Sequence, residues 1–246
     1  MKFFQYSLTC FFFLSMFSHA DEYDLFLCIG QSNMSGRGEM NDKHKKEIKH
    51  AYILNTKGEW SSAKAPFNAY STVRKDLKIQ GVNPVYSFAH ALSKFSGKKK
   101  IGYVVNARGG TKISQWQPNE ELFEEAVKRA KLAQKTGTFK AILWHQGEGN
   151  RKSTTYSKSL ATMVEALRKE LNSPDLLVIV GEIAGEAVVN EQLATFVIET
   201  SNTVLVSAKE LTMKDKSHFD TAGQIELGKR YAKAYLKAQA GTKAKN

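Results

Sequence analysis

The sequence has 246 residues, of which 42% are hydrophobic, and a formal net charge of +12. This length suits one sizeable domain, and the apolar content is enough for a buried core, which excludes a chain that stays disordered. The positive charge is carried by blocks of lysine that lack interleaved aromatic residues and any nucleic-acid-binding motif, so we expect no nucleic-acid partner.

The first 20 residues, MKFFQYSLTCFFFLSMFSHA, have the pattern of a secretory signal peptide. Lys2 precedes a Phe-rich apolar stretch, and Ser18-His19-Ala20 forms a small-x-small cleavage site. The stretch is shorter than the roughly 20 apolar residues that span a bilayer. We therefore predict cleavage after Ala20, a secreted or periplasmic protein without stable membrane insertion, and a single domain over residues 21–246. An uncleaved anchor is the alternative.

Only one cysteine, Cys28, remains in the predicted mature chain. No disulfide can therefore form within it, and the fold must depend on its core. Cys28 lies in an apolar run, where we expect it to be buried as a small hydrophobic residue.

Six short apolar runs are continuous rather than alternating, which is typical of parallel strands covered on both faces. We expect strands over residues 25–29, 51–54, 101–105, 141–144, 176–180 and 204–206.

Longer amphipathic segments lie between these runs, and their ends carry helix-capping signals. The last of them begins with a capping box formed by Thr221 and Gln224. We expect helices from Pro84 to about residue 95, from a cap at Asn119 to just before Gly137, over residues 156–171, and from Thr221 onward. Strands that alternate with helices predict an α/β fold, a three-layer α/β/α sandwich with a mainly parallel central sheet.

In such a sheet, ligands bind beyond the carboxyl ends of the strands, so the loops at those ends are the place to look for chemistry. Four of these loops are rich in polar residues and glycine. Their sequences are GQSNM at 30–34, NARGGT at 106–111, WHQGE at 144–148 and DKSHF at 215–219.

Together these loops supply the groups needed for acyl transfer from an ester. Ser32 offers a hydroxyl, and His218 offers an imidazole that can accept its proton near neutral pH. Asp215, three residues before His218, can hold the imidazole in the required tautomer. The alternative for Ser32 is a simple helix cap.

The oxyanion formed during attack needs preplaced hydrogen-bond donors. We predict that these are the backbone N–H groups of Ser32 and Gly110 and the side-chain amide of Gln146. Glycine suits this position because it lets the backbone approach the substrate closely.

The same stretches resemble the SGNH-hydrolase superfamily, and within it the group of sialate O-acetylesterase-like and family-6 carbohydrate acetylesterases. The resemblance rests on 30–38, on Gly109-Gly110-Thr111-Lys112-Ile113 with Trp116, on 144–148, and on 215–223, in the right order along the whole mature chain. The GQSNM and WHQGE stretches are specific to this group, whereas a glycine pair alone is not.

The resemblance implies an SGNH or flavodoxin-like sheet and removal of O-acetyl groups from sugars, without a metal or organic cofactor. It implies that Ser32 is the nucleophile, His218 the base, and Asp215 the carboxylate partner of the base. It implies that Gly110, or Gly109, contributes to the oxyanion hole, and that Gln146 stands where many members have asparagine. Some members assign the triad acid to the glutamate of the HQGE stretch, so Glu148 is the alternative to Asp215.

Three further residues could contact an acetylated carbohydrate substrate. Trp116 either forms an apolar wall against a sugar ring or is a core residue, while Arg37 and Arg108 either meet an acidic sugar or have structural roles. The sequence predicts an exported serine esterase with an acetyl-enzyme intermediate. The alternatives are a non-catalytic glycan-binding module and an SGNH lipase or thioesterase for longer acyl chains. The particular glycan, the hydroxyl position and the oligomeric state are left open.

Overall fold

The computed structural model describes residues 23–185 and 187–243. The predicted signal peptide and its cleavage site after Ala20 lie outside these residues. Within the described part of the chain, no helix combines the length and the apolar character that a membrane span requires.

Seven strands form one sheet in the order β3-β2-β4-β1-β5-β6-β7. All neighbouring pairs are parallel except β2 and β3, which form an antiparallel pair at one edge. The strands are β1 (Tyr23–Gly30), β2 (Ala51–Leu54), β3 (Trp60–Ser62), β4 (Ile101–Ala107), β5 (Gly137–His145), β6 (Leu177–Gly181) and β7 (Thr203–Val206). The predicted α/β fold with a mainly parallel sheet is confirmed.

Strand β1 shows why the sheet needs a helical layer on each face. Its side chains alternate between two separate apolar cores, with Leu25 and Leu27 in one and Phe26 and Cys28 in the other. All four side chains are at most 1% exposed, so Cys28 is buried as predicted. A strand that is apolar on both faces is stable only when both faces are covered.

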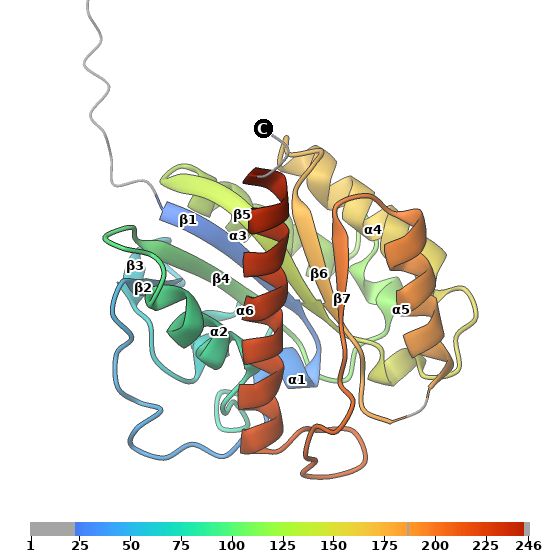
Figure 1. The fold of residues 1–246 in the computed structure, drawn as a ribbon, viewed down its shortest axis with the longest axis horizontal. Helices are drawn as coiled ribbons and strands as arrows, with labels where there is room; N and C mark the ends of the chain where they lie inside the picture. The colour runs from blue at the N-terminus through green and yellow to red at the C-terminus, as the bar shows by residue number, and fades with distance from the viewer. Residues whose placement is uncertain (1–22, 186, 244–246) are drawn as a thin grey trace, which may run out of the picture.

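Each helix covers the face of the sheet whose core contains its buried side chains. Helices α3 (Glu121–Gln134), α4 (Tyr156–Glu170) and α5 (Val188–Glu199) supply the core on one face. Helices α2 (Pro84–Ser93) and α6 (Thr221–Lys243) supply the other and also contact each other. Figure 1 shows α6 and α2 in front of the sheet, with α4 and α5 at its right-hand side.

Apart from the helices of four residues or fewer, two elements of the described fold were not predicted from the sequence, the strand β3 and the helix α5. Strand β3 is only three residues long and is at most half-buried, so it carries no apolar run. Helix α5 has a weak amphipathic pattern, because Ile198 on its surface is 85% exposed while Leu193 and Phe196 are buried.

The predicted start of α3 was wrong. Asn119 does not cap the helix; its backbone is left-handed, with a φ of 73°, and the helix begins at Glu121. Asparagine tolerates this conformation better than most residues, so it serves here in the turn that precedes the helix.

The predicted capping box of α6 was also wrong, although the helix begins at Thr221 as expected. Asp220 caps the helix instead, because its carboxylate accepts a hydrogen bond of 2.8 Å from the backbone N–H of Gly223. The side chain of Gln224 points elsewhere and donates to Asn33. The residue expected to close the cap therefore connects α6 to the segment that follows β1.

The strand order places one reversal of direction at the centre of the sheet. The chain passes from β1 to β4 on one side, with the edge pair β2-β3 inserted, and then crosses to β5 on the other side. The order β4-β1-β5-β6-β7 is that of flavodoxin-like folds. Ligand sites in such folds lie at this point, beyond the carboxyl end of the central strand.

Candidate active site

Ser32 lies at the point where the strand order reverses. Gly30 ends β1, pairs with Ala107 of β4 and His145 of β5, and has a φ of 139°. A Cβ atom on Gly30 would lie 2.1 Å from the carbonyl oxygen of His145, so only glycine fits. The chain then turns sharply into the short helix α1 (Ser32–Ser35), which places Ser32 directly above the sheet edge.

The loop between β7 and α6 brings an imidazole and a carboxylate to this serine. Nε2 of His218 lies 3.0 Å from Oγ of Ser32, and Nδ1 of His218 lies 2.8 Å from Oδ2 of Asp215. The three groups thus form a hydrogen-bonded series from hydroxyl to imidazole to carboxylate. In Figure 1 this loop runs beside α1 at the lower edge of the sheet.

Asp215 also closes the turn that carries the imidazole. Its Oδ1 accepts hydrogen bonds of 2.9 Å from the backbone N–H groups of Ser217 and His218. Hydrogen bonds from the His218 ring and from these N–H groups lower the pKa of Asp215 to about 2. The carboxylate is therefore ionised at neutral pH and accepts from Nδ1, which leaves Nε2 to face Ser32 as an acceptor.

The glycine pair lies beside Ser32, in a loop tied to β1 by a 3.0 Å bond from the Arg108 N–H to the Gly30 carbonyl. A Cβ atom on Gly109 would lie only 3.4 Å from Cβ of Ser32, whereas Gly110 is exposed and has a φ of 73°. Among the described residues, the backbone N–H groups of Ser32, Gly109 and Gly110 have no hydrogen-bond acceptor. No protein acceptor therefore competes with a ligand for these three N–H groups.

The structure contradicts the prediction that Gln146 offers its amide to an oxyanion. Gln146 is fully buried, and its Nε2 donates to the carbonyl of Thr111 at 2.9 Å and to Oδ1 of Asn150 at 3.0 Å. Its Oε1 accepts from the Tyr156 hydroxyl at 2.6 Å. A primary amide has two hydrogens, and here both have protein acceptors because the loop after Gly110 folds back over this side chain.

The structure also contradicts the interpretation of Trp116 as a wall against a sugar ring. Trp116 is completely buried and lies edge-on against Trp144, with 5.3 Å between ring centroids. Its Nε1 donates to Oγ1 of Thr111 at 3.1 Å. The alternative, that Trp116 is a core residue, is correct. Its hydrogen bond to Thr111 anchors the glycine-rich loop to the core.

Both arginines have protein partners, and Nη2 of Arg37 lies beside Gly109. Nη1 of Arg37 donates to the carbonyls of Gly36 at 2.7 Å and Ile79 at 3.3 Å, and burial lowers its pKa, with Asp215 opposing this effect. Arg108 is half-buried and lies 3.7 Å from the carboxylate of Glu121. The structural alternative for Arg37 agrees with these contacts.

Glu148 lies on the inner side of the site, away from the imidazole. Its side chain is 4% exposed, and Oε1 accepts from Nδ2 of Asn33 at 2.5 Å and lies 3.8 Å from Nε2 of His145. Burial raises the pKa of Glu148 to about 7, against the opposing effects of Asn33 and Arg151, and lowers the pKa of His145 to about 3. The carboxylate that contacts His218 is thus Asp215.

Asn33 was quoted in the GQSNM stretch but was given no role from the sequence. The structure shows it fully buried and bonded both to Glu148 and to the loop of His218. The only signal in the sequence was its position next to Ser32.

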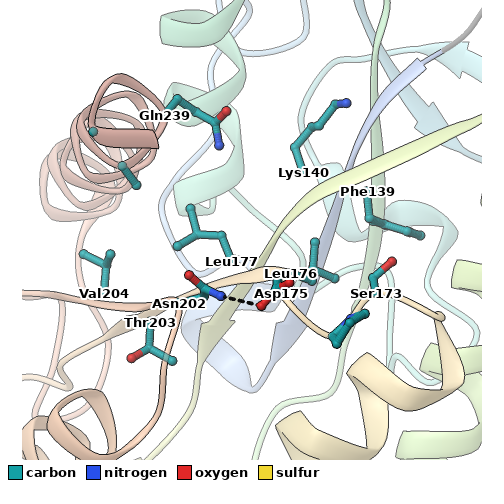
Figure 2. Close-up of a pocket in the computed structure, with 13 residues that line it drawn as sticks. Phe139, Lys140, Ser173, Asp175, Leu176, Leu177, Asn202, Thr203, Val204 and Gln239 are labelled. Atoms are coloured by element: carbon teal, nitrogen blue, oxygen red, sulfur yellow. Dashed lines mark hydrogen bonds between the residues drawn. The ribbon is translucent and has the colours of Figure 1, made fainter. Parts of the chain in front are cut away.

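A separate hollow lies at the opposite edge of the sheet, at the amino ends of β5, β6 and β7 (Figure 2). It is lined by Phe139, Lys140, Asp175 and Asn202, among others, and Asn202 donates to Asp175 at 3.1 Å. It contains none of the predicted site residues. No group of three or more His, Cys, Asp or Glu side chains is arranged to hold a metal ion within residues 23–185 and 187–243.

A hydroxyl, an imidazole and a carboxylate in series at the carboxyl edge of a parallel sheet are the groups that α/β ester hydrolases use. Residues 22–237 match the family described as carbohydrate esterase, sialic acid-specific acetylesterase. Because this match covers most of the chain, the protein belongs to that family and is a carbohydrate esterase.

A probable carbohydrate esterase of Arabidopsis thaliana is 32% identical over 236 residues, which cover 86% of this chain and 90% of the relative. The X-ray structure of an Arabidopsis thaliana protein superimposes with a TM-score of 0.79 and 30% identity, over 88% of this chain and 98% of that one. NanS superimposes with a TM-score of 0.73 and 17% identity, over 90% and 99% of the two chains. At this identity, NanS shows a shared fold alone.

The raised pKa of Glu148 predicts a pH-dependent contribution to stability. Since the folded protein holds this proton more tightly than the unfolded chain, the contribution is complete below pH 4.5, the ordinary pKa, and is lost as pH rises through about 7. Glu148→Gln should therefore raise the free energy of unfolding relative to wild type more at pH 8 than at pH 5, by at most about 3 kcal/mol. Urea unfolding of both proteins at the two pH values measures this difference. An equal change in the free energy of unfolding at pH 5 and pH 8 would contradict the raised pKa of Glu148.

Proposed function

We propose that this protein is an exported serine esterase that removes O-acetyl groups from carbohydrates through an acetyl-enzyme intermediate. The observation that carries the proposal is the hydrogen-bonded series of Ser32, His218 and Asp215 at the carboxyl edge of the sheet. Membership of a carbohydrate esterase family favours an enzyme over the non-catalytic glycan-binding alternative.

In the first half of the reaction, Nε2 of His218 takes the proton of Ser32 while Oγ attacks the carbonyl carbon of the acetyl group. The tetrahedral intermediate collapses, the C–O bond to the sugar breaks, and the imidazolium returns the proton to the departing sugar oxygen. In the second half, a water molecule gives one proton to His218 and attacks the carbonyl carbon of the acetyl-serine. The bond from this carbon to Oγ then breaks, the imidazolium returns the proton to Oγ, and acetate leaves.

The backbone N–H groups of Ser32 and of the Gly109-Gly110 turn are our proposed oxyanion donors. Gly109 packs against Ser32, and all three N–H groups have no protein acceptors among the described residues. A donor in such a position typically lowers the barrier by about 3–4 kcal/mol. The buried amide of Gln146 contributes indirectly, by holding the carbonyl of Thr111 and thus the glycine loop.

The family description suggests O-acetylated sialic acid as a substrate, and acetylated polysaccharides are the alternative. A short acyl group is favoured over the long chains of lipases, because polar or charged side chains, among them Arg37, Lys75 and Arg108, lie close to the glycine loop. Release of acetate from sialic acid, xylan and other acetylated glycans distinguishes these substrates.

Replacement of the proposed nucleophile should abolish turnover. We expect Ser32→Ala to reduce kcat on p-nitrophenyl acetate by about 10⁴-fold or more while the protein remains folded by circular dichroism. Ser159→Ala, which removes a partly exposed hydroxyl on α4, is the matched control and should keep wild-type kcat. Turnover that survives Ser32→Ala would remove Ser32 from the mechanism.

The two carboxylates should differ in importance. In Asp215→Asn, the side-chain oxygen can still accept from the N–H groups of the turn, but the new amide can donate to the imidazole and select the wrong tautomer. This substitution should therefore lower kcat by about 10²–10⁴-fold. Glu148→Gln keeps an oxygen for Asn33 and should retain most of kcat. Steady-state kinetics on the two variants identifies the triad acid. A larger loss of kcat in Glu148→Gln than in Asp215→Asn would make Glu148 that acid.

Export rests on the leader sequence, with residues 21–246 as the single esterase domain of the mature protein. The protein expressed with its own leader in a bacterial host should appear in the periplasm or medium with Asp21 as its first residue. N-terminal sequencing of the purified protein provides the measurement. A product that retains Met1 and sediments with membranes would indicate an uncleaved anchor.

A further inference from the structure

The side chain of Asn33, the residue after the proposed nucleophile, has every hydrogen-bonding position of its amide occupied. Oδ1 accepts from the backbone N–H of Phe219 at 3.1 Å and from Nε2 of Gln224 at 2.9 Å. Nδ2 donates to the carbonyl of Ser217 at 2.9 Å and to Oε1 of Glu148 at 2.5 Å. An asparagine amide has two hydrogens and one oxygen with two lone pairs, so no capacity remains.

The orientation of this amide is fixed by groups that cannot exchange roles. The carbonyl of Ser217 only accepts and the N–H of Phe219 only donates, so Nδ2 must face Ser217 and Oδ1 must face Phe219. Glu148 reinforces this orientation, because its carboxylate accepts from the same Nδ2. Asn33 is completely buried, so water does not compete for these bonds.

Two of the four bonds lie on either side of His218. The amide of Asn33 is hydrogen-bonded to the carbonyl of Ser217, the residue before His218, and to the N–H of Phe219, the residue after it. Because Asn33 is bonded covalently to Ser32, this is a short connection between the backbone of the hydroxyl and the backbone of the imidazole.

The other bonds of the His218 turn do not make this connection. The N–H of Lys214 donates to the carbonyl of His218 at 2.8 Å, and Asp215 bonds to the ring and to two N–H groups of the same turn. These bonds shape the turn but leave its distance from Ser32 undetermined. In the described part of the chain, three hydrogen bonds join residues 214–219 to α1. One is the contact between His218 and Ser32, and the other two are made by the amide of Asn33.

We propose that Asn33 is a positioning residue for the esterase reaction: its amide fixes the backbone on both sides of His218 and so holds the imidazole within reach of the Ser32 hydroxyl, with Glu148 holding the amide in place. This inference rests on the proposed roles of Ser32 and His218. It also gives the buried glutamate of the WHQGE stretch a role other than that of the triad acid.

Asn33→Asp tests the proposal with little change in size. The introduced carboxyl group has one hydrogen when protonated, where the amide has two. When protonated, its single hydrogen can serve only one of the two acceptors, Glu148 or the Ser217 carbonyl, so one of the two bonds is lost. When ionised, it faces both acceptors with oxygen, so the bond to Ser217 is lost as well. A displacement of about 1 Å at a reacting group can cost about 10²-fold in rate. We therefore expect kcat on p-nitrophenyl acetate to fall by about 10²-fold, with KM changed little.

Asn190→Asp is the matched control. Asn190 likewise holds a loop by its amide, since Nδ2 donates to the carbonyls of Ile183 and Gly185 and Oδ1 accepts from the Ile183 N–H. That loop follows β6 and has no contact with Ser32 or His218 among the hydrogen bonds of the described residues. Asn190→Asp should lower thermal stability but keep the kcat of wild type.

A second readout is independent of turnover. The proton that His218 shares with Asp215 should give a low-field ¹H NMR resonance, and Asn33→Asp should shift or broaden it while Asn190→Asp leaves it unchanged. If the wild type has no esterase activity, the proposed function fails, but this resonance still reports on the imidazole. If wild type is active and Ser32→Ala is not, the positioning role can fail on its own.

The positioning role is overturned if folded Asn33→Asp keeps kcat within about threefold of wild type and leaves the resonance in place. Asn33→Ser, which is uncharged and too short to span both sides of His218, repeats the test if the aspartate variant does not fold. Failure of both variants to fold would also contradict the proposal, since Asn33 would then be required for the fold as a whole.

Discussion

The parallel pairing of β1 with β4 on one side and β5 on the other is the constraint on which the site depends. In this register Gly30 stands opposite both Ala107 and His145, so the three strands end at the same level. Three polar loops therefore start together at the edge of the sheet. A shift of one residue in this register would turn the side chains of β1 toward the wrong core and move Ser32 away from the glycine loop.

Beneath the series of Ser32, His218 and Asp215, the site is supported by buried amide and aromatic side chains. Gln146, Trp116 and Tyr156 are fully buried and hold Thr111 or one another by hydrogen bonds. Buried polar groups of this kind are stable only when they find partners, and once paired they fix a single arrangement. The glycine loop can therefore leave backbone N–H groups free without losing its shape.

The two carboxylates near Ser32 show how surroundings decide chemistry. Asp215 is half-exposed and has several N–H partners, which lower its pKa to about 2. Glu148 is buried away from water, which raises its pKa to about 7 against the opposing effects of Asn33 and Arg151. Nothing in the composition of the DKSHF and WHQGE stretches distinguishes these two carboxylates, because desolvation and hydrogen bonding belong to the folded state.

The sequence was enough to predict the parallel α/β architecture, the burial of Cys28 and the loops that carry Ser32, Asp215 and His218, because continuous apolar runs and strand-end loops are local patterns. It did not reveal the edge strand β3, the helix α5 or the left-handed turn at Asn119, whose local signals are weak. The folded structure was needed to show that Trp116 and Gln146 face inward and that Asn33 joins four segments. Those outcomes depend on contacts between residues far apart in the chain, such as Asn33 with Gln224, which no local pattern contains.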